Sequence, residues 1–260
     1  MKLIDTHCHI YAEEFDPEQD ELMRQAIESG IDTLLLPNED LTSIDRLLAF
    51  CDRYPQNAYP MMGLHPESVK ADWAEVLSQI EKQLQKHDFC GIGEIGMDLY
   101  WDKTYIEEQR KAFEEQLQWS IDLDLPVSIH MRAAFQEVLD CIYKVGPDKL
   151  KGVFHCFTGN LAELEELDKL THFKIGIGGV VTYKNSPLPE TLKSCTMDKI
   201  VLETDAPYLP PVPYRGRRNE PIYIWKTAEK LSEIRGINIE ETVLRTRKNA
   251  LNLFKNVNNV

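Results

Sequence analysis

The chain has 260 residues, of which 43% are hydrophobic and 28% charged, and its net charge is −14. No apolar run approaches the roughly 20 residues that span a bilayer, so the composition predicts a globular protein without a membrane segment. The acidic balance disfavours a protein that binds nucleic acid through a basic surface. It still permits an enzyme that takes one strand end into a metal site, because the cations supply positive charge there.

Short apolar runs alternate with amphipathic helical patterns along the whole chain. The runs predicted as strands are residues 2–6, 33–37, 59–64, 90–95, 126–129, 152–154, 173–177 and 200–203. Runs that are apolar on both faces and separated by helices predict an α/β protein with a parallel sheet covered by helices. Eight such units favour one TIM-like (β/α)8 barrel, for which roughly 250 residues are typical. An open doubly wound sheet is the alternative.

We expect residues 1–260 to form a single domain, because the chain contains no evident linker or internal repeat. The first residues are MKLIDTHCHIYAEEF, which is not the pattern of a signal peptide. A cytoplasmic location is therefore expected. The cysteines form no CxxC pair, so we expect reduced thiols, not a thiolate metal site.

Imidazoles and carboxylates collect at the ends of the predicted strands. They are His7, His9, His65, Glu94, His130, His155, Glu203 and Asp205. In an α/β barrel the carboxyl ends of the strands form the face that carries the active site. Burying so many ionisable groups together is costly unless cations compensate their charge. This distribution therefore predicts a metal-dependent enzyme.

The spacing of these residues suggests how they are grouped. Side chains alternate along a strand, so His7 and His9 are expected to point the same way. Glu203 and Asp205 share this period, and the first and eighth strands are neighbours in a closed barrel, so Asp205 can join the two histidines on one cation. His130 and His155 can hold a second cation, and the two oxygens of Glu94 could bridge the pair. Such mixed ligands suit Zn²⁺ or Mn²⁺, with Mg²⁺ possible.

Six segments resemble the characteristic blocks of TatD-type deoxyribonucleases and occur in the same order. They are LIDTHCHI, GLHPE, GEIGMDLYWD, LPVSIHMRAA, FHCFTG and LETDAPYLPPVPYRGRRNEP. The resemblance extends from about residue 2 to residue 257. It implies a metal-dependent nuclease that hydrolyses phosphodiester bonds of DNA, with 3′–5′ exonuclease action on single strands, two divalent cations and no obligate protein partner. One departure is Tyr11, which stands where the family often has Asp or Asn.

The resemblance also implies roles for individual residues. His7 and His9 resemble the ligands of the first metal, Glu94 the bridge, and His130 and His155 the ligands of the second metal. Asp205 resembles the remaining ligand and the general base. The other two catalytic candidates, His65 and Glu203, match positions that serve phosphate binding and support of the ligands.

Substrate contacts are predicted from positive charge near the expected mouth of the barrel. Arg132 should share the inward face of His130, and the last long loop carries Arg215, Arg217 and Arg218, the densest basic cluster of the chain. Tyr100, Trp101 and Tyr183 are candidates for stacking on bases. Cys156, next to His155, is expected to point away from the site into the core.

Two other functions remain open at this point. The first is an amidohydrolase-like enzyme that acts on small-molecule amides, lactones or phosphate esters with similar metal ligands. The segment RGRRNEP favours DNA, whereas a closed apolar pocket would favour the small-molecule enzyme. The second is a binding protein on a barrel that has lost its chemistry, and it would be expected to lack some of the ligands.

Overall fold

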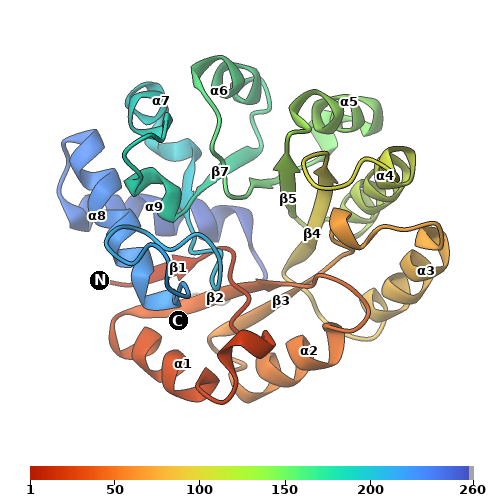
Figure 1. The fold of residues 1–260 in the computed structure, drawn as a ribbon, viewed down its shortest axis with the longest axis horizontal. Helices are drawn as coiled ribbons and strands as arrows, with labels where there is room; N and C mark the ends of the chain where they lie inside the picture. Colours follow the sequence, from red (N-terminus) through yellow and green to blue (C-terminus); the bar gives the residue numbers. More distant parts are fainter. Residues whose placement is uncertain (258–260) are drawn as a thin grey trace.

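The computed structural model describes residues 1–257, in which eight parallel strands follow one another in the order β1 to β8 (Figure 1). The strands are β1 (Leu3–Asp5), β2 (Ile31–Pro37), β3 (Ala58–Met62), β4 (Gly91–Asp98), β5 (Val127–Arg132), β6 (Gly152–Phe154), β7 (Phe173–Ile177) and β8 (Ile200–Leu202). The α-helices surround them: α1 (Gln19–Glu28), α2 (Ile44–Arg53), α3 (Trp73–Leu84), α4 (Ile106–Leu123), α5 (Phe135–Val145), α6 (Leu161–Asp168), α7 (Leu188–Ser194), α8 (Ile224–Arg235) and α9 (Ile239–Leu253). Within this part of the chain, no helix combines the length and apolarity needed to cross a bilayer.

The first and last strands meet through backbone hydrogen bonds at and just beyond their carboxyl ends. The amide of Thr6 donates to the carbonyl of Leu202 at 3.0 Å, and the amide of Asp205 donates to the carbonyl of His7 at 2.9 Å. A third bond joins the amide of His9 to the carbonyl of Ala206 at 2.8 Å. These bonds close the sheet, so the predicted TIM-like barrel is confirmed and the open sheet is not found.

All eight predicted strands are present, and the largest differences are at β4 and β5. Both strands extend beyond their predicted ends, β4 to Asp98 and β5 to Arg132. The extensions pair with each other in parallel register, Gly96 opposite His130 and Asp98 opposite Arg132. Polar side chains obscured these extensions in the sequence, because the predicted strands were defined by apolar runs.

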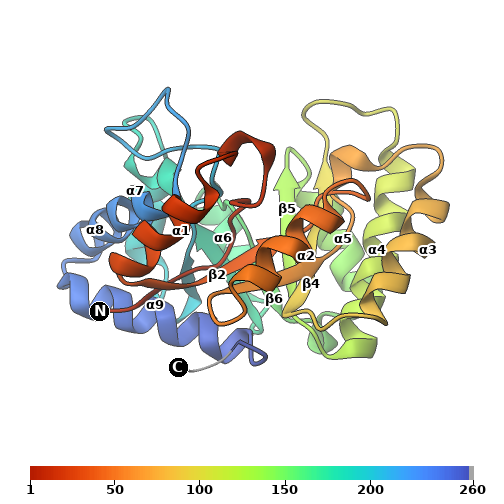
Figure 2. The same cartoon turned by 90° about the horizontal axis from the view of Figure 1, so that it is seen from below.

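Helix α9 closes the amino-terminal end of the barrel. Ala250, Leu253, Phe254 and Val257 pack with Ile4, Leu35, Met61, Val153 and Val201 in one buried apolar cluster. Figure 2 shows α9 below the strands and the loops that follow β4 and β8 on the opposite side. The barrel is therefore packed at its base, which leaves the carboxyl ends of the strands as the face where polar groups meet water.

Candidate metal centre

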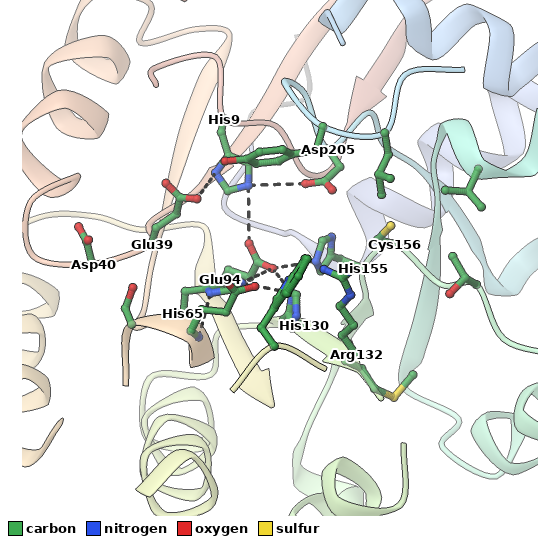
Figure 3. A pocket seen from close by; sticks show the side chains of 18 of the residues that line it. His9, Glu39, Asp40, His65, Glu94, His130, Arg132, His155, Cys156 and Asp205 are labelled. Atoms are coloured by element: carbon green, nitrogen blue, oxygen red, sulfur yellow. Dashed lines mark hydrogen bonds and ion pairs between the residues drawn. The ribbon is translucent and has the colours of Figure 1, made fainter. Parts of the chain in front are cut away.

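Glu94 is the central group of the site and lies buried in β4, with 3% of its surface exposed (Figure 3). Its Oε2 atom lies 3.1 Å from Nε2 of His7 and 3.6 Å from Nε2 of His9. Asp205 Oδ1 approaches the same two nitrogens at 3.8 and 3.7 Å. One oxygen of Glu94 thus faces a group formed by His7, His9 and Asp205, which follow β1 and β8.

The other oxygen of Glu94 faces three imidazoles from β5 and from the segments after β3 and β6. Oε1 lies 2.8 Å from Nδ1 of His130, 2.8 Å from Nε2 of His155 and 3.3 Å from Nε2 of His65. The carboxylate therefore has one oxygen directed at each of two donor groups. A single side chain in this position can bridge two cations.

Hydrogen bonds on the far side of three imidazoles direct their remaining nitrogens into the site. Nδ1 of His7 is 3.0 Å from the Ser128 hydroxyl, and Nε2 of His130 is 2.9 Å from Oδ2 of Asp98. Nδ1 of His9 is 3.4 Å from the Tyr11 hydroxyl, which itself donates to the carbonyl of Pro37. When the outer nitrogen donates its proton to such a partner, the inner nitrogen keeps a lone pair for a metal.

No function was predicted for Ser128, Asp98 or Tyr11 from the sequence. The alternation of side chains along a strand could have identified two of them. Ser128 lies two residues before His130 on β5, and Asp98 lies four residues after Glu94 on β4, so each is expected on the same face as its neighbour in the site. Tyr11 lies past the end of β1 in an irregular segment, so no sequence periodicity predicted its contact with His9.

His65 has the opposite arrangement of ring nitrogens. The backbone amide of Glu67 donates to Nδ1 of His65 at 3.1 Å, so the neutral ring carries its proton on Nε2. This Nε2 faces Glu94 Oε1 and lies 3.2 Å from Nδ1 of His130. In this tautomer His65 brings a hydrogen-bond donor to the site, whereas a metal ligand requires a lone pair.

Glu203 lies beneath the site and is fully buried. Its Oε1 accepts a hydrogen bond from the backbone amide of Cys156 and lies 3.7 Å from Nδ1 of His155. Within residues 1–257, His155 Nδ1 and Glu203 Oε2 lack a hydrogen-bond partner. Glu203 therefore contacts His155 from below and is not among the described residues that line the cavity, and its catalytic role stays a prediction.

Burial and neighbouring charges shift the pKa values of the site in both directions: those of Asp205, His130 and His155 are raised, and those of His7, His9 and Glu94 are lowered. Burial lowers the pKa of His9 to about 4 and that of His7 well below its ordinary value. Burial also opposes ionisation of Glu94, but the surrounding imidazoles, His155 first, bring its pKa well below the usual range. Burial raises the pKa of Asp205 to about 8. His7 and His9 are thus neutral and can offer lone pairs.

These residues fit divalent cations. Nε2 of His7 and Nε2 of His9 lie 3.1 Å apart, and two neutral nitrogens that both point lone pairs into one space repel unless a proton or a cation lies between them. Asp205 is a buried acid whose anionic form requires nearby positive charge. Two of the donor groups that could hold an ion are His7 with His9 and Glu94, and His7 with His155 and Asp205.

A cavity of about 910 Å³ opens above these groups. Its floor includes Glu94, His130 and Asp205, and its walls include Trp101 and Arg132. Trp101 is 64% exposed, so the cavity reaches the protein surface. Such a volume lies near the upper end of the about 300–1,000 Å³ that is usual for small-molecule sites.

Comparison with known proteins identifies the family. The model of the TatD-related DNases matches residues 4–255. The chain belongs to this family. It is 34% identical over 255 residues to the metal-dependent hydrolase YabD of Bacillus subtilis, covering 97% of this chain and 99% of that protein. It is also 28% identical to the 3′-5′ ssDNA/RNA exonuclease TatD of Erwinia amylovora, covering 97% and 99% of the two chains.

The crystal structure of the TatD homologue YjjV from Escherichia coli has the same fold, with a TM-score of 0.91 and 29% identity over 97% of this chain and 98% of that one. The predicted family and the predicted class of enzyme are confirmed. This member of the TatD family is a metal-dependent hydrolase, and its His, Glu and Asp side chains are placed to bind metal.

The arginines predicted to bind substrate occupy different environments in this TatD-family chain. Arg132 lines the cavity. Arg215 lies over the ring of Tyr183, which also lines the cavity, with 4.3 Å from the guanidinium carbon to the ring centroid. The described residues that line the cavity do not include Arg215, Arg217 or Arg218.

Arg218 is engaged by other groups of the chain, and its contact with substrate stays a prediction. Its guanidinium forms ion pairs with Glu18 and Glu220 and donates to the carbonyl of Glu14 at 2.7 Å. Arg218 therefore joins the last loop to the segment before α1. A cation that is already paired with two carboxylates is poorly placed to bind a phosphate.

The prediction that Cys156 points into the core is wrong, because the cysteine is partly exposed and lines the cavity. Strand β6 ends at Phe154, and Cys156 has a φ of 46°. The alternation of side chains does not continue through this left-handed conformation, so the spacing from His155 did not predict the direction of the thiol.

Proposed function

We propose that the chain is an exonuclease that removes nucleotides from 3′ ends of single-stranded DNA, with two divalent cations on either side of Glu94. The observation that carries this proposal is the division of donors around one carboxylate, with His7 and His9 at Oε2 and His130 and His155 at Oε1. Two-metal sites of this kind are typical of enzymes that hydrolyse phosphate esters. The exonuclease named TatD in Erwinia amylovora supports the choice of substrate.

Each ligand has a defined task in this proposal. His7, His9 and Asp205 would hold one cation, His130 and His155 the other, and Glu94 would bridge them. When bound, the cations would supply Lewis acidity that activates water and stabilises charge on the phosphoryl oxygens. Mg²⁺, Mn²⁺ and Zn²⁺ all suit this mixture of imidazole and carboxylate ligands.

The remaining groups would move a proton or orient the phosphate. The carboxylate of Asp205 would accept the proton of the attacking water, because it lies at the cavity floor beside His7 and His9. His65 would donate a hydrogen bond from Nε2 to a nonbridging oxygen of the phosphate. Glu203 would keep His155 oriented from below through its Nδ1 side.

The shape of the cavity favours a polymer end over a small apolar molecule. The floor carries buried ionisable groups, and the walls include the exposed side chains of Trp101, Tyr208 and Leu209. A strand end can enter such an opening and leave the rest of the polymer in solvent. The closed apolar pocket expected of the small-molecule hydrolase is not what these residues form.

The test is hydrolysis of single-stranded DNA labelled at its 5′ end, after the protein has been stripped of metal and each cation has been restored separately. We expect stepwise shortening from the 3′ end that requires added metal and stops when the last 3′ linkages are phosphorothioates. His7→Ala and Glu94→Gln should remove the activity. His87→Ala is the matched control, because His87 is exposed and remote from the site.

Two results would contradict the proposal. Shortening that continues unchanged past the blocked 3′ end would remove the assigned polarity. Metal binding without hydrolysis of any nucleic acid, together with hydrolysis of small esters or lactones, would replace the nuclease with the small-molecule hydrolase.

A further inference from the structure

The loop between β4 and α4 carries two exposed aromatic residues, Tyr100 and Trp101, of which Trp101 lines the cavity. Tyr100 is 57% exposed and Trp101 is 64% exposed. Their rings contact each other edge to face, with centroids 4.8 Å apart and an interplanar angle of 86°. A contiguous exposed apolar patch beside a cavity is typical of a surface that binds a ligand.

Arg132, from the end of β5, lies against both rings. Its guanidinium carbon is 4.3 Å from the centroid of Tyr100 and 5.0 Å from that of Trp101. Anywhere in residues 1–257, no carboxylate forms an ion pair with Arg132, although the chain carries a net charge of −14. Arg46, Arg53, Arg218 and Arg247, by contrast, are paired with acids. Arg132 is thus a cation at the cavity wall that is free to pair with an anion from outside the chain.

This cluster is attached rigidly to the metal centre. Oδ1 of Asp98 accepts hydrogen bonds from the amides of Tyr100 and Trp101 at 2.9 and 3.3 Å, while its Oδ2 contacts Nε2 of His130 at 2.9 Å. The amide of Leu99 donates to the carbonyl of Arg132 at 2.9 Å. Asp98 therefore connects the loop that carries Tyr100 and Trp101 to His130, which lies beside Glu94.

We propose that Tyr100, Trp101 and Arg132 form a subsite for the nucleotide next to the scissile phosphodiester, in which Trp101 stacks on its base and Arg132 binds its phosphate. This inference rests on the proposed nuclease function and names the part of the substrate that this wall of the cavity binds. Arg132 stands two residues beyond His130 on the same strand, about 7 Å along the backbone. The neighbouring nucleotide, not a distant one, is therefore within its reach.

The chemistry of the subsite also determines which nucleic acids it can bind. An indole face stacks on any base, so the subsite should tolerate all four bases. It requires a base whose face is free, as in a single strand. A guanidinium can form two parallel hydrogen bonds with a phosphate, which neither aromatic side chain provides.

The experiment compares two single-stranded oligonucleotides of equal length, one of thymidines throughout and one with abasic residues in its last three 3′ positions. Binding is measured by the anisotropy of a 5′ fluorophore, and hydrolysis is measured with metal present. For Trp101→Ala we expect affinity and KM for the first oligonucleotide to weaken about tenfold, the scale of one base–aromatic stack. For the abasic oligonucleotide we expect no change.

Matched variants separate stacking from a general loss of structure. Trp101→Phe keeps an aromatic face and should retain most of the affinity, whereas Tyr143→Ala, which removes an exposed ring from α5, should have no effect. Arg132→Gln should weaken both oligonucleotides, and Arg245→Gln on α9 should weaken neither. Tryptophan fluorescence of the wild type should be quenched by the thymidine oligonucleotide and much less by the abasic one.

The subsite would be overturned if Trp101→Ala weakened both oligonucleotides equally or neither of them. The anisotropy and quenching measurements need no hydrolysis, so they test the subsite separately. If the protein bound DNA with the expected dependence on Trp101 but cut nothing, the proposed function would fail and the subsite would remain. If it cut DNA without that dependence, the subsite alone would fail.

Discussion

Asp98 and His130 form a hydrogen bond of 2.9 Å between Oδ2 and Nε2, while Nδ1 of the same imidazole lies 2.8 Å from Oε1 of Glu94. Asp98 therefore determines which nitrogen of His130 carries a proton. Because burial opposes the charged ring and the two carboxylates favour it, the net effect is a raised pKa for His130. The dependence of the His130 proton on Asp98 can be tested by substituting Asp98 with the isosteric asparagine.

Asp98→Asn should weaken metal binding about 10- to 100-fold, the usual effect of removing a partner behind a metal-binding histidine. The asparagine oxygen can still accept from the amides of Tyr100 and Trp101, so its amide group would face His130 and donate to Nε2. The ring proton would then move to Nδ1, where the lone pair is needed. Competition with a chelating dye measures the affinity, and Asp140→Asn on α5 is the control. Unchanged affinity would show that Asp98 does not orient His130.

Tyr11→Phe should weaken metal binding and the fold together. The substitution removes the acceptor of the His9 Nδ1 proton and leaves the Pro37 carbonyl without the hydroxyl that bonds to it at 2.6 Å. Losing one such buried hydrogen bond costs about 1 kcal/mol in the free energy of unfolding. Urea denaturation and metal titration give the two values. Tyr54→Phe, which removes a hydroxyl bonded to Asp20, should leave metal affinity unchanged.

Removal of metal should lower the melting temperature of the wild type. A ligand at 100 times its Kd stabilises the native state by about 2.7 kcal/mol, and for a chain of this size each kcal/mol corresponds to roughly 2–4 °C. We therefore expect a rise of about 5–10 °C when Mn²⁺ or Zn²⁺ is added to stripped protein. Glu94→Gln should abolish most of this rise, and a rise of equal size in that variant would exclude Glu94 as a ligand.

Arg218→Ala should affect stability and not substrate binding. Its ion pairs with Glu18 and Glu220 join two distant segments, and a partly exposed network of this kind contributes about 1 kcal/mol or less. The urea midpoint should fall while KM for single-stranded DNA stays within about twofold of the wild type. A large increase in KM at unchanged stability would instead support the substrate role that the sequence predicts for Arg218.

The cysteine thiols should be unreactive in the native protein at pH 8. All six, each within residues 1–257, are free, and all but Cys156 are buried. Burial raises the pKa of Cys51 and Cys195 to about 12 and that of Cys141 to about 11. We expect at most one thiol to react with Ellman's reagent before unfolding and six after it. Rapid reaction of several thiols in folded protein would contradict this.

The same shifts predict how stability depends on alkaline pH. Thiols of the unfolded chain ionise near pH 8.5, whereas these buried thiols stay protonated until about pH 11–12. Their contribution to stability is therefore complete below pH 8.5 and is lost as pH rises through the folded values. The urea midpoint should decrease between pH 8.5 and 10, and the decrease should be smaller in Cys51→Ala.

Much of this protein could be predicted from local sequence. Apolar runs such as those of β6 and β7 must be buried wherever they lie, so both strands have the bounds that the pattern predicts. The positions of His7 and Asp205 just past the ends of β1 and β8 follow from the same pattern, because parallel strands of a barrel deliver their carboxyl ends to one face. The assignment of individual metal ligands stays a prediction.

Tertiary structure decided the partners of charged and polar side chains. Arg218 pairs with Glu18, 200 residues away, while Arg132 lies over two aromatic rings and pairs with no acid among residues 1–257. Both arginines were predicted to contact substrate, because a charge in the sequence does not indicate which group will lie nearest to it in space. The left-handed turn at Cys156 likewise ended the periodicity on which the sequence argument depended. Burial is a property of the local pattern, whereas electrostatic pairing depends on distances that exist only once the barrel has closed.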